Sequence, residues 1–287
     1  MTSTSSKPVG IVTGAGSGIG LAVATHLVSK GYRVVIADMN PKTGTATAES
    51  LGADAKFIQC DVSSYRAQAQ LFKQAYEWGG NRLDFCHANA GVDDRENLYH
   101  MKEEVDEEGL VKPLNTKCME VNMEGVIQGL HLFKYYVRRS KDHNGGKGKF
   151  VATSSAAGFY AMTTNPQYTA SKYGVIGLTR AAGPELVKEG ITVNCICPGF
   201  VPTNLCPPGI LEVWPKEHIT PLTTVTKAID AFLGDDTMTG QAVELSQGNL
   251  YPRPMHDYPN ASQRWIAEEA VHIWAKFYAK VPEKAGY

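Results

Sequence analysis

Residues 9–20 read VGIVTGAGSGIG, an apolar run that leads directly into a turn with four glycines. The run is typical of a buried strand, and the residues from about Ile19 to Lys30 favour a helix. A strand-to-helix turn that lets backbone N–H groups approach a pyrophosphate cannot hold Cβ atoms at its tightest points. Gly14, Gly18 and Gly20 meet that need. Because the helix N-terminus is partly positive, the stretch predicts a dinucleotide-binding turn.

The next apolar run favours this interpretation over an ordinary strand-to-helix connection. Residues 33–37 (RVVIA) lead into Asp38, 18 positions after Gly20, where a ribose-binding acid is expected. A carboxylate there accepts hydrogen bonds from ribose hydroxyls and repels a 2′-phosphate, and Met39 and Asn40 after it add no positive charge. We therefore expect NAD(H) rather than NADP(H). The alternative is a solvated Asp at a strand end.

Composition limits the class of protein. The chain has 287 residues, a net charge of −1 and 43% hydrophobic residues, which suits one α/β domain and argues against a nucleic-acid partner. The sequence contains no run of about 18 apolar residues, and residues 1–7 lack a signal-peptide core. We therefore expect a cytoplasmic protein without a membrane partner.

The cysteines lack the paired CxxC spacing of zinc sites. Most of them lie in or beside apolar runs, so we expect reduced thiols and no metal. Cys195 and Cys197 would share one face of a strand, where packing is favoured over redox or metal chemistry. The six cysteines are Cys60, Cys86, Cys118, Cys195, Cys197 and Cys206.

Apolar runs alternate with helical patterns along the chain. This alternation predicts an α/β fold with a seven-stranded, doubly wound parallel sheet and helices on both faces. The continuous apolar character of the runs fits strands that are covered on both sides. The predicted strands are Val9–Val12, Val34–Ala37, Lys56–Gln59, Leu83–His87, Lys149–Thr153, Thr192–Ile196 and Gln241–Leu245.

One domain is expected over residues 8–250, with a substrate loop around 200–220. Two segments look like additions to it. The segment Asp93 to Lys117 is polar and acidic, which favours a solvated loop or helix face. In the extension 251–287, aromatic and apolar residues recur every three to four positions over 262–280. We expect an amphipathic helix there, packed on the domain or on a neighbouring subunit.

Tyr168 and Lys172 occur in the segment YTASK, on a stretch that favours a helix from Tyr168 to Lys188. Their i, i+4 spacing places the phenol and the ammonium on one helix face. Ser155 lies 13 residues upstream of the tyrosine, just after a predicted strand. Because active sites of such sheets form at the carboxyl ends of strands, the three side chains form a candidate catalytic set.

At this point the sequence resembles the short-chain dehydrogenase/reductase family, whose fold is of the Rossmann type. The resemblance covers about residues 8–250, and the motifs stand in the family's order and spacing. They are TGAGSGIG, Asp61-Val62, Asn89-Ala90-Gly91, Asn122, Ser155, Tyr168 with Lys172, and Pro198-Gly199 with Thr203.

The resemblance implies a role for each catalytic residue. Tyr168 is the general acid/base toward the substrate oxygen, and Ser155 binds that oxygen. Lys172 binds the nicotinamide ribose and, with the oxidised nicotinamide, lowers the pKa of the Tyr168 phenol from about 10 by roughly 3 units. Asn122 holds a water that relays protons from Lys172. The alternative for Asn122 is a helix-interior side chain satisfied by backbone.

The resemblance also implies the cofactor contacts. Asp61 contacts the adenine amino group, Asn89 supports the sheet and the cofactor, and Thr203 with the backbone near Gly199 orients the carboxamide. The full expected set is Gly14, Ser17, Gly18, Ile19, Gly20, Asp38, Asp61, Val62, Asn89, Ala90, Gly91, Tyr168, Lys172, Pro198, Gly199, Val201 and Thr203.

Bulky apolar residues follow Ser155 and Pro198-Gly199, where the family builds its substrate pocket. An aromatic lining suits a hydrophobic secondary alcohol or ketone, although several of these side chains could equally be core. The expected substrate contacts are Phe159, Tyr160, Phe200, Leu205 and Trp214. The chain most resembles the NAD-dependent branch that includes 15-hydroxyprostaglandin dehydrogenase and, after it, alcohol dehydrogenases of fungal natural-product pathways.

Other functions stay open on the same scaffold. A non-catalytic NAD sensor or scaffold would be expected to lose part of the Ser, Tyr and Lys set. A non-redox enzyme such as a dehalogenase would not need the glycine turn. The sequence does not separate oxidation or reduction from a cyclisation or isomerisation assisted by bound cofactor. Because helices around 118–139 and 168–188 pair between subunits in the family, we expect a homodimer or homotetramer.

Overall fold

The structure is a computed structural model that describes residues 7–96, 98–99 and 104–278. The chain separates into two compact units, Met1–Arg253 and Pro254–Tyr287. None of the helices among the described residues is both long enough and apolar enough to cross a membrane.

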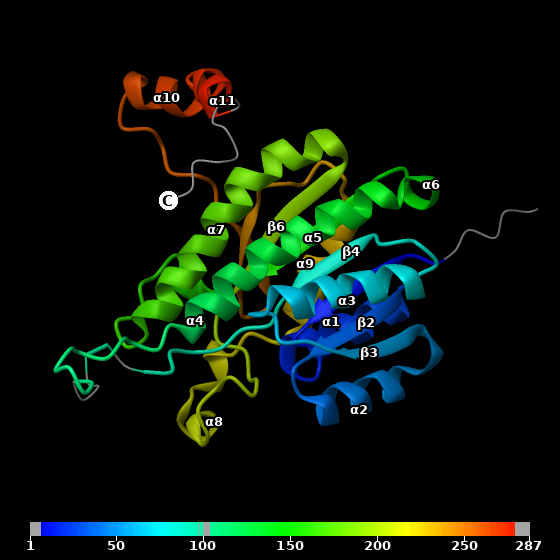
Figure 1. Cartoon of the computed structure of the whole chain (residues 1–287), viewed down its shortest axis with the longest axis horizontal. Helices are drawn as coiled ribbons and strands as arrows, with labels where there is room; N and C mark the ends of the chain where they lie inside the picture. Colours follow the sequence, from blue (N-terminus) through cyan, green and yellow to red (C-terminus); the bar gives the residue numbers. More distant parts are fainter. Residues whose placement is uncertain (1–6, 97, 100–103, 279–287) are drawn as a thin grey trace, which may run out of the picture. The chain divides into compact units, whose positions relative to one another are not determined.

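The first unit is built on one eight-stranded sheet, shown in Figure 1. The strands lie side by side in the order β3-β2-β1-β4-β5-β6-β7-β8. In chain order they are β1 (Val9–Thr13), β2 (Arg33–Asp38), β3 (Ala55–Gln59), β4 (Phe85–Ala88), β5 (Gly148–Thr153), β6 (Ile191–Pro198), β7 (Ala242–Ser246) and β8 (Asn249–Pro252).

The seven predicted parallel strands are confirmed, and none of their ends differs from the predicted end by more than two residues. The strand count is corrected to eight, because β8 pairs antiparallel with β7 after a two-residue turn. The run NLYP in β8 is short and mostly exposed, so it carries no continuous apolar pattern that would have marked it as a strand.

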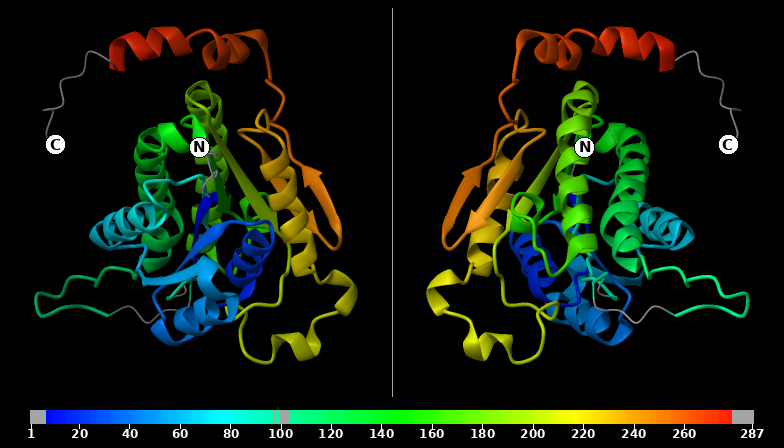
Figure 2. Two further views of the ribbon diagram at one scale, coloured as in Figure 1. Left: turned by 90° about the vertical axis from the view of Figure 1, so that its right-hand side faces the viewer. Right: turned by 90° about the vertical axis from the view of Figure 1, so that its left-hand side faces the viewer.

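Helices cover both faces of the sheet, as Figure 2 shows. The connections between strands contain α1 (Gly18–Ser29), α2 (Pro41–Leu51), α3 (Tyr65–Trp78), α4 (Lys117–Met119), α5 (Gly125–Arg139), α6 (Lys141–Asn144), α7 (Pro166–Leu186), α8 (Ile210–Val213) and α9 (Leu222–Gly234). Short turns complete them: η1 (Gly52–Asp54), the π-helical η2 (Glu120–Glu124), η3 (Ala156–Gly158), η4 (Val187–Glu189) and η5 (Lys216–His218).

Each face of the sheet has its own apolar core. On one face, α3, α5 and α7 bury side chains such as Phe72, Phe133 and Val175 against the strands. On the other face, α1, α2 and α9 bury side chains such as Leu27 and Phe232. Both cores hold the strands rigidly and leave their carboxyl ends to carry loops.

The strand order reverses at β1: β2 and β3 follow on one side of it, and β4 to β8 follow on the other side. In a doubly wound sheet, the loops that leave two such neighbouring strands diverge and open a crevice. The glycine turn follows β1, and the motif Asn89-Ala90-Gly91 follows β4. The fold therefore brings these two segments to the same point.

The acidic segment 93–117 is only partly a solvated loop. Residues 104–112 are exposed, and Val105 and Val111 form an isolated antiparallel bridge. Asp93 and Asp94 depart from the expectation, because both are half-buried and hydrogen-bonded to the start of α7. Residues 97 and 100–103 lie outside the described residues.

The second unit contains two helices where the sequence predicted one, α10 (Ala261–Glu268) and α11 (Val271–Tyr278). The amide of Ala270 donates to the carbonyl of Trp265, which closes a wider turn than an α-helix allows and ends α10. The carbonyl of Ala270 then accepts from Ile273 and Trp274 and starts the second helix. Residues 279 and 280 of the predicted helix lie outside the described residues.

Candidate active site

The turn after β1 has a backbone that only glycine tolerates. Gly14 and Gly18 have positive φ angles of 63° and 54°. A Cβ at Gly14 would lie 2.9 Å from the Ala90 Cα, and one at Gly20 would lie 2.2 Å from the Gly14 carbonyl oxygen. A Cβ at Gly18 would lie 2.9 Å from the Thr203 side chain. The glycine turn therefore lies against two other predicted cofactor-binding segments, the one that contains Ala90 and the one that contains Thr203.

The N-terminus of α1 has free capacity for an anion. Ser17 is its N-cap, yet within the described part of the chain its side chain makes no capping hydrogen bond and the first turn holds no acidic residue. Ile19, in that turn, is partly buried against the core beneath α1. The first amides of a helix are electropositive donors, so this end suits a phosphate group.

Asp38 holds the glycine turn at the end of β2. One carboxylate oxygen accepts from the Gly16 amide at 2.9 Å, and the other accepts from the Asn40 amide at 2.9 Å. A Cβ at Gly16 would lie 2.5 Å from the Thr43 hydroxyl and 2.9 Å from Asp38. The carboxylate is thereby fixed beside the turn, as its predicted role requires.

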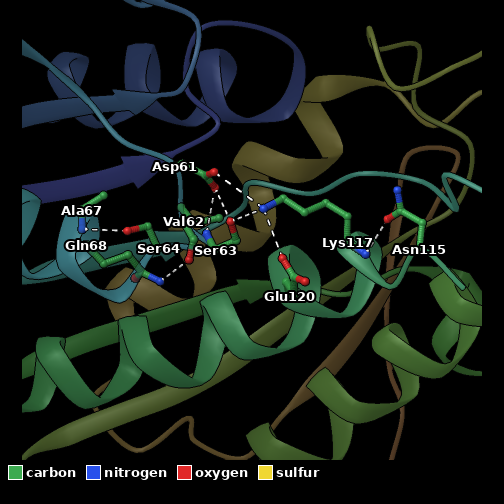
Figure 3. A network of polar contacts seen from close by, with 9 residues as sticks. All are labelled: Asp61, Val62, Ser63, Ser64, Ala67, Gln68, Asn115, Lys117 and Glu120. Carbon is green, nitrogen blue, oxygen red and sulfur yellow. Dashed lines mark hydrogen bonds and ion pairs between the residues drawn. The ribbon is translucent and has the colours of Figure 1, made fainter. Parts of the chain in front are cut away.

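Asp61 lies in a polar network at the carboxyl end of β3, drawn in Figure 3. One of its oxygens accepts from the Ser63 amide at 2.9 Å and the Ser63 hydroxyl at 2.6 Å. The Lys117 ammonium lies 3.7 Å from the other oxygen and 3.2 Å from Glu120. The Ser63 hydrogen bonds, with help from Lys117, lower the pKa of Asp61. The neighbouring Val62 carbonyl accepts from Gln68 at 2.6 Å.

Asn89 joins three strands below the site. Its side-chain nitrogen donates to the Thr13 carbonyl at 3.0 Å, and its side-chain oxygen accepts from the Thr153 hydroxyl at 3.1 Å. The Thr153 hydroxyl has one proton, so its 2.8 Å contact with His87 Nε2 uses an N–H donated by the histidine. Thr13, Thr153 and His87 were not predicted, because nothing in the pattern of their strands distinguishes them.

Ser155, Tyr168 and Lys172 converge as the sequence predicts. Ser155 follows β5, while Tyr168 and Lys172 lie in the first two turns of α7. The Lys172 Nζ donates to the Thr153 carbonyl at 2.9 Å and lies 5.2 Å from the centre of the Tyr168 ring. A Cβ at Gly91 would lie 3.7 Å from that Nζ, so the segment after β4 adjoins the lysine.

The pKa of Tyr168 is raised to about 12. Burial of the phenol is the main cause, the Asp93 charge adds to it, and a hydrogen bond with the Ser155 hydroxyl acts in the opposite direction. Burial also lowers the pKa of Lys172 to about 8. In the chain alone, burial therefore dominates the pKa of Tyr168. The expected lowering, which involves the oxidised nicotinamide as well as Lys172, stays a prediction for the cofactor-bound protein.

Asn122 is fully buried within the π-helical turn between α4 and α5. Its side-chain oxygen accepts from the Val92 amide at 2.9 Å, and its nitrogen donates to the Val92 carbonyl at 2.9 Å and to Ser171 at 3.2 Å. A Cβ at Gly91 would lie 3.3 Å from the same oxygen. The side chain is thus bound to the backbone after β4, as in the alternative left open from the sequence, and the proton-relay role of Asn122 stays a prediction.

The segment after β6 leads toward the glycine turn. The Gly199 amide donates to the Leu245 carbonyl at 2.8 Å, where Pro198 ends β6, and Val201 is buried. The Thr203 hydroxyl accepts from the Leu205 amide at 3.4 Å. Both of these contacts fix the segment that carries Thr203.

The expected substrate residues form two aromatic pairs. Phe200 and Trp214 stack with ring centres 3.9 Å apart, and the indole N–H of Trp214 is buried with no acceptor among the described residues. Phe159 packs edge-on against Tyr160 and touches the core on the α7 side. The Tyr160 hydroxyl donates to Glu244 at 3.2 Å. Leu205 is 43% exposed, so it has surface to offer a ligand.

Comparisons with known proteins place the chain in a family. Residues 8–208 match the short chain dehydrogenase family. The chain is 31% identical over 267 residues to short-chain dehydrogenase/reductase prx6 of Penicillium rubens, covering 91% of this chain and 87% of that protein. It is 34% identical over 217 residues to 15-hydroxyprostaglandin dehydrogenase (NAD+) of Homo sapiens, covering 73% of this chain and 72% of that protein.

Solved structures share the fold. A 3-ketoacyl-(acyl-carrier-protein) reductase from Brucella melitensis, complexed with NADH, superposes with a TM-score of 0.71 at 22% identity, covering 84% of this chain and 97% of that chain. A short-chain type dehydrogenase/reductase from Mycobacterium marinum gives a TM-score of 0.72 at 22% identity, covering 85% of this chain and 95% of that chain. With the family match over residues 8–208 and the motifs converging as described, the chain belongs to the short-chain dehydrogenase/reductase family of oxidoreductases.

Proposed function

We propose that the protein is an NAD(H)-dependent oxidoreductase that interconverts a hydrophobic secondary alcohol and its ketone. The observation that carries the proposal is the convergence of Ser155, Tyr168 and Lys172 beside the segment Asn89 to Gly91. The names of two comparison proteins support it, since one is an NAD+-dependent hydroxyprostaglandin dehydrogenase and another was solved with NADH.

The residues fit a dinucleotide. The glycine turn leaves no Cβ between backbone and ligand, and the α1 N-terminus is an uncapped electropositive end. Asp38 would bind the adenosine ribose and Asp61 the adenine, while Thr203 and the backbone near Gly199 would bind the carboxamide. When bound, the oxidised dinucleotide accepts a hydride from the alcohol carbon, and the reduced form returns it to the ketone.

Tyr168 transfers the proton to and from the substrate oxygen. In the oxidation, its phenolate takes the proton of the substrate hydroxyl, and in the reduction its phenol returns that proton to the carbonyl oxygen. The Ser155 hydroxyl donates a hydrogen bond to the same oxygen and holds it in line. Below about pH 8 the Lys172 ammonium is charged, and its positive charge favours the phenolate.

NAD(H) is proposed over NADP(H) because Asp38 occupies the position next to the glycine turn. A 2′-phosphate placed there would meet a carboxylate, and like charges at that distance repel. Lys42, in the first turn of α2, is the cation that follows Asp38 most closely in the sequence and was not considered in the sequence-based prediction. It is the residue to substitute if NADPH binds unexpectedly well.

The proposed substrate is apolar around the reacting carbon. Phe200 with Trp214 supplies a stacked aromatic surface, and Leu205 adds an exposed aliphatic side chain on the same segment. Burial of apolar substrate surface contributes about 25 cal/mol per Å². The unpartnered Trp214 N–H favours a substrate with one acceptor oxygen away from the reacting carbon.

The test is a screen of hydrophobic secondary alcohols with NAD+, followed by the absorbance of NADH, on the natural chain and on Tyr168→Phe. The substitution removes the proton-transferring hydroxyl, so turnover is expected to fall by at least about a hundredfold while NADH still binds. Tyr173→Phe is the matched control in the same helix, since that hydroxyl donates to the Phe159 carbonyl. Near-normal turnover of Tyr168→Phe would refute the assignment.

A further inference from the structure

The first turn of α7, which carries Tyr168, is capped by a residue from a different loop. Asn165 occupies the N-cap position, but its side chain makes no capping hydrogen bond. Instead, the two oxygens of Asp94 accept from the Gln167 amide at 3.1 Å and from the Tyr168 amide at 2.6 Å. One carboxylate therefore satisfies two helix-start donors across 74 residues of sequence.

The remaining donors of this turn are accounted for without Asp94. Pro166 has no N–H, and the Thr169 amide donates to the Asn165 carbonyl at 2.9 Å. The Asn165 side chain donates to Asp93 at 2.6 Å, and Asp93 also accepts from the Asp94 amide at 2.9 Å. The capping oxygen that helices ordinarily obtain from their own N-cap is thus supplied here by Asp94.

The loop that carries Asp94 is itself anchored. Two residues earlier, the amide and the carbonyl of Val92 are bound by the Asn122 side chain at 2.9 Å each. Asn122 also donates to the Ser171 hydroxyl, which donates to the Tyr168 carbonyl at 2.7 Å. The backbone N–H of Tyr168 is therefore bound by Asp94, and its C=O is bound by Ser171, which Asn122 connects to Val92. Both Asp94 and Val92 belong to the segment after β4.

We propose that Asp94 is a positioning residue for Tyr168: it fixes the tyrosine-bearing turn of α7 to the loop that begins with Asn89 to Gly91. This inference rests on the proposed function, because it assigns the contact a purpose in placing the proton-transferring phenol. The carboxylate is suited to the task, since negative charge at a helix N-terminus is stabilised and charged acceptors make the stronger hydrogen bonds.

The test compares Asp94→Ala with Asp94→Asn, which keeps one acceptor oxygen. Hydrogen exchange of the amides in residues 165–170 reports the contact without any need for turnover. Loss of both acceptors is expected to speed that exchange by about tenfold or more, with an intermediate effect for Asp94→Asn. With a substrate from the screen, kcat is expected to fall by about tenfold to a hundredfold in Asp94→Ala, because small misplacement of a reacting group is costly.

The KM and the NADH dissociation constant separate positioning from general loss of structure. Among the described residues, the hydrogen bonds of the Asp94 carboxylate go to α7 and not to the glycine turn. Both constants are therefore expected to stay within about threefold, a change worth under 1 kcal/mol. Asp235→Ala is the matched control. That carboxylate also accepts two backbone amides, from Thr237 at 2.7 Å and Met238 at 3.2 Å, but it lies after α9. Asp235→Ala should leave kcat unchanged even where it lowers the thermal stability as much as Asp94→Ala does.

Two outcomes would overturn the inference. Unchanged exchange at residues 165–170 in Asp94→Ala would show that the carboxylate does not hold the turn, and an unchanged kcat would show that the turn does not place the phenol. Absence of turnover in the natural chain together with faster exchange in Asp94→Ala would instead count against the proposed function and leave the capping contact supported.

Discussion

The Tyr168 phenol and the Lys172 ammonium are each held in surroundings that oppose their charged forms. Burial raises the pKa of the tyrosine to about 12 and lowers that of the lysine to about 8. Both shifts favour the neutral side chains, yet a general base needs the charged phenolate. The proposed reaction therefore depends on positive charge beside the phenol, and we expect the Lys172 ammonium, 5.2 Å from the centre of the Tyr168 ring, to supply it.

His87 shows a second residue-scale effect, on stability rather than on chemistry. Burial lowers its pKa to about 3 from an ordinary value of 6.5. Between these values the unfolded chain binds a proton that the folded chain rejects, so the free energy of unfolding should fall as the pH drops from about 6.5 to 3. At about 1.4 kcal/mol per pKa unit, this one residue accounts for roughly 5 kcal/mol over the whole window.

His87→Gln, which keeps a donor for Thr153 and cannot take the proton, should flatten that dependence. Urea unfolding at pH 7 and pH 4.5 would measure it, and the loss of stability between the two should be smaller in the variant by about 2 to 3 kcal/mol. His143→Gln is the control, because that side chain is exposed. An identical loss in the natural chain and in His87→Gln would contradict the account.

At the scale of elements, the packing of α7 against the loop before β7 leaves no room for a side chain. A Cβ at Gly183 would lie 2.4 Å from the Gly240 amide nitrogen and 2.6 Å from its Cα. Gly183→Ala should lower the free energy of unfolding by about 1 to 3 kcal/mol, as overpacking against backbone does.

Gly234→Ala, at the end of α9, is the matched control. Its Cβ would meet nothing within 4 Å, so the substitution should be neutral or stabilising by up to about 1 kcal/mol. Urea unfolding of both variants would measure the two effects. Equal stabilities for the two variants would mean that α7 does not sit as closely on the loop as described.

The elements differ in how well the sequence predicted them. Most of the strands β1 to β7 were found because strands covered on both faces are continuous apolar runs, whereas β3, at the edge of the sheet, is only partly buried. β8 was missed because it is short and exposed. The single predicted tail helix is two helices, because the break after Glu268 is made by a backbone hydrogen bond that leaves the spacing of apolar residues unchanged.

For the molecule as a whole, the motif order predicted which side chains would meet but not what holds them. Gly91, Asn122 and Lys172 converge because the sheet topology brings their strands and helices to one end. The capping of α7 by Asp94 was missed because the two segments lie 74 residues apart and the acidic stretch that contains Asp94 has the composition of a solvated loop. A contact of that kind needs the fold first.

Assembly belongs to the same scale. On α5 and α7, the side chains of Ile127, Tyr135 and Tyr173 are 40, 49 and 46% exposed. We propose that these side chains pair two copies of the chain, because burial of such apolar surface favours association. Light scattering at micromolar protein should give at least a dimeric mass, and Ile127→Glu should lower it. A monomeric mass for the natural chain would contradict the proposal.

The proposed function requires that the protein bind a nicotinamide dinucleotide at the carboxyl ends of β1 and β4, and the position of Asp38 predicts which one. Calorimetric titration of the purified protein with NADH and, separately, with NADPH measures this directly. We predict a dissociation constant for NADH of the order of micromolar, about −8 kcal/mol, with NADPH at least about tenfold weaker. Asp38→Ala should narrow that difference. Binding of neither nucleotide, or tighter binding of NADPH, would contradict the central claim.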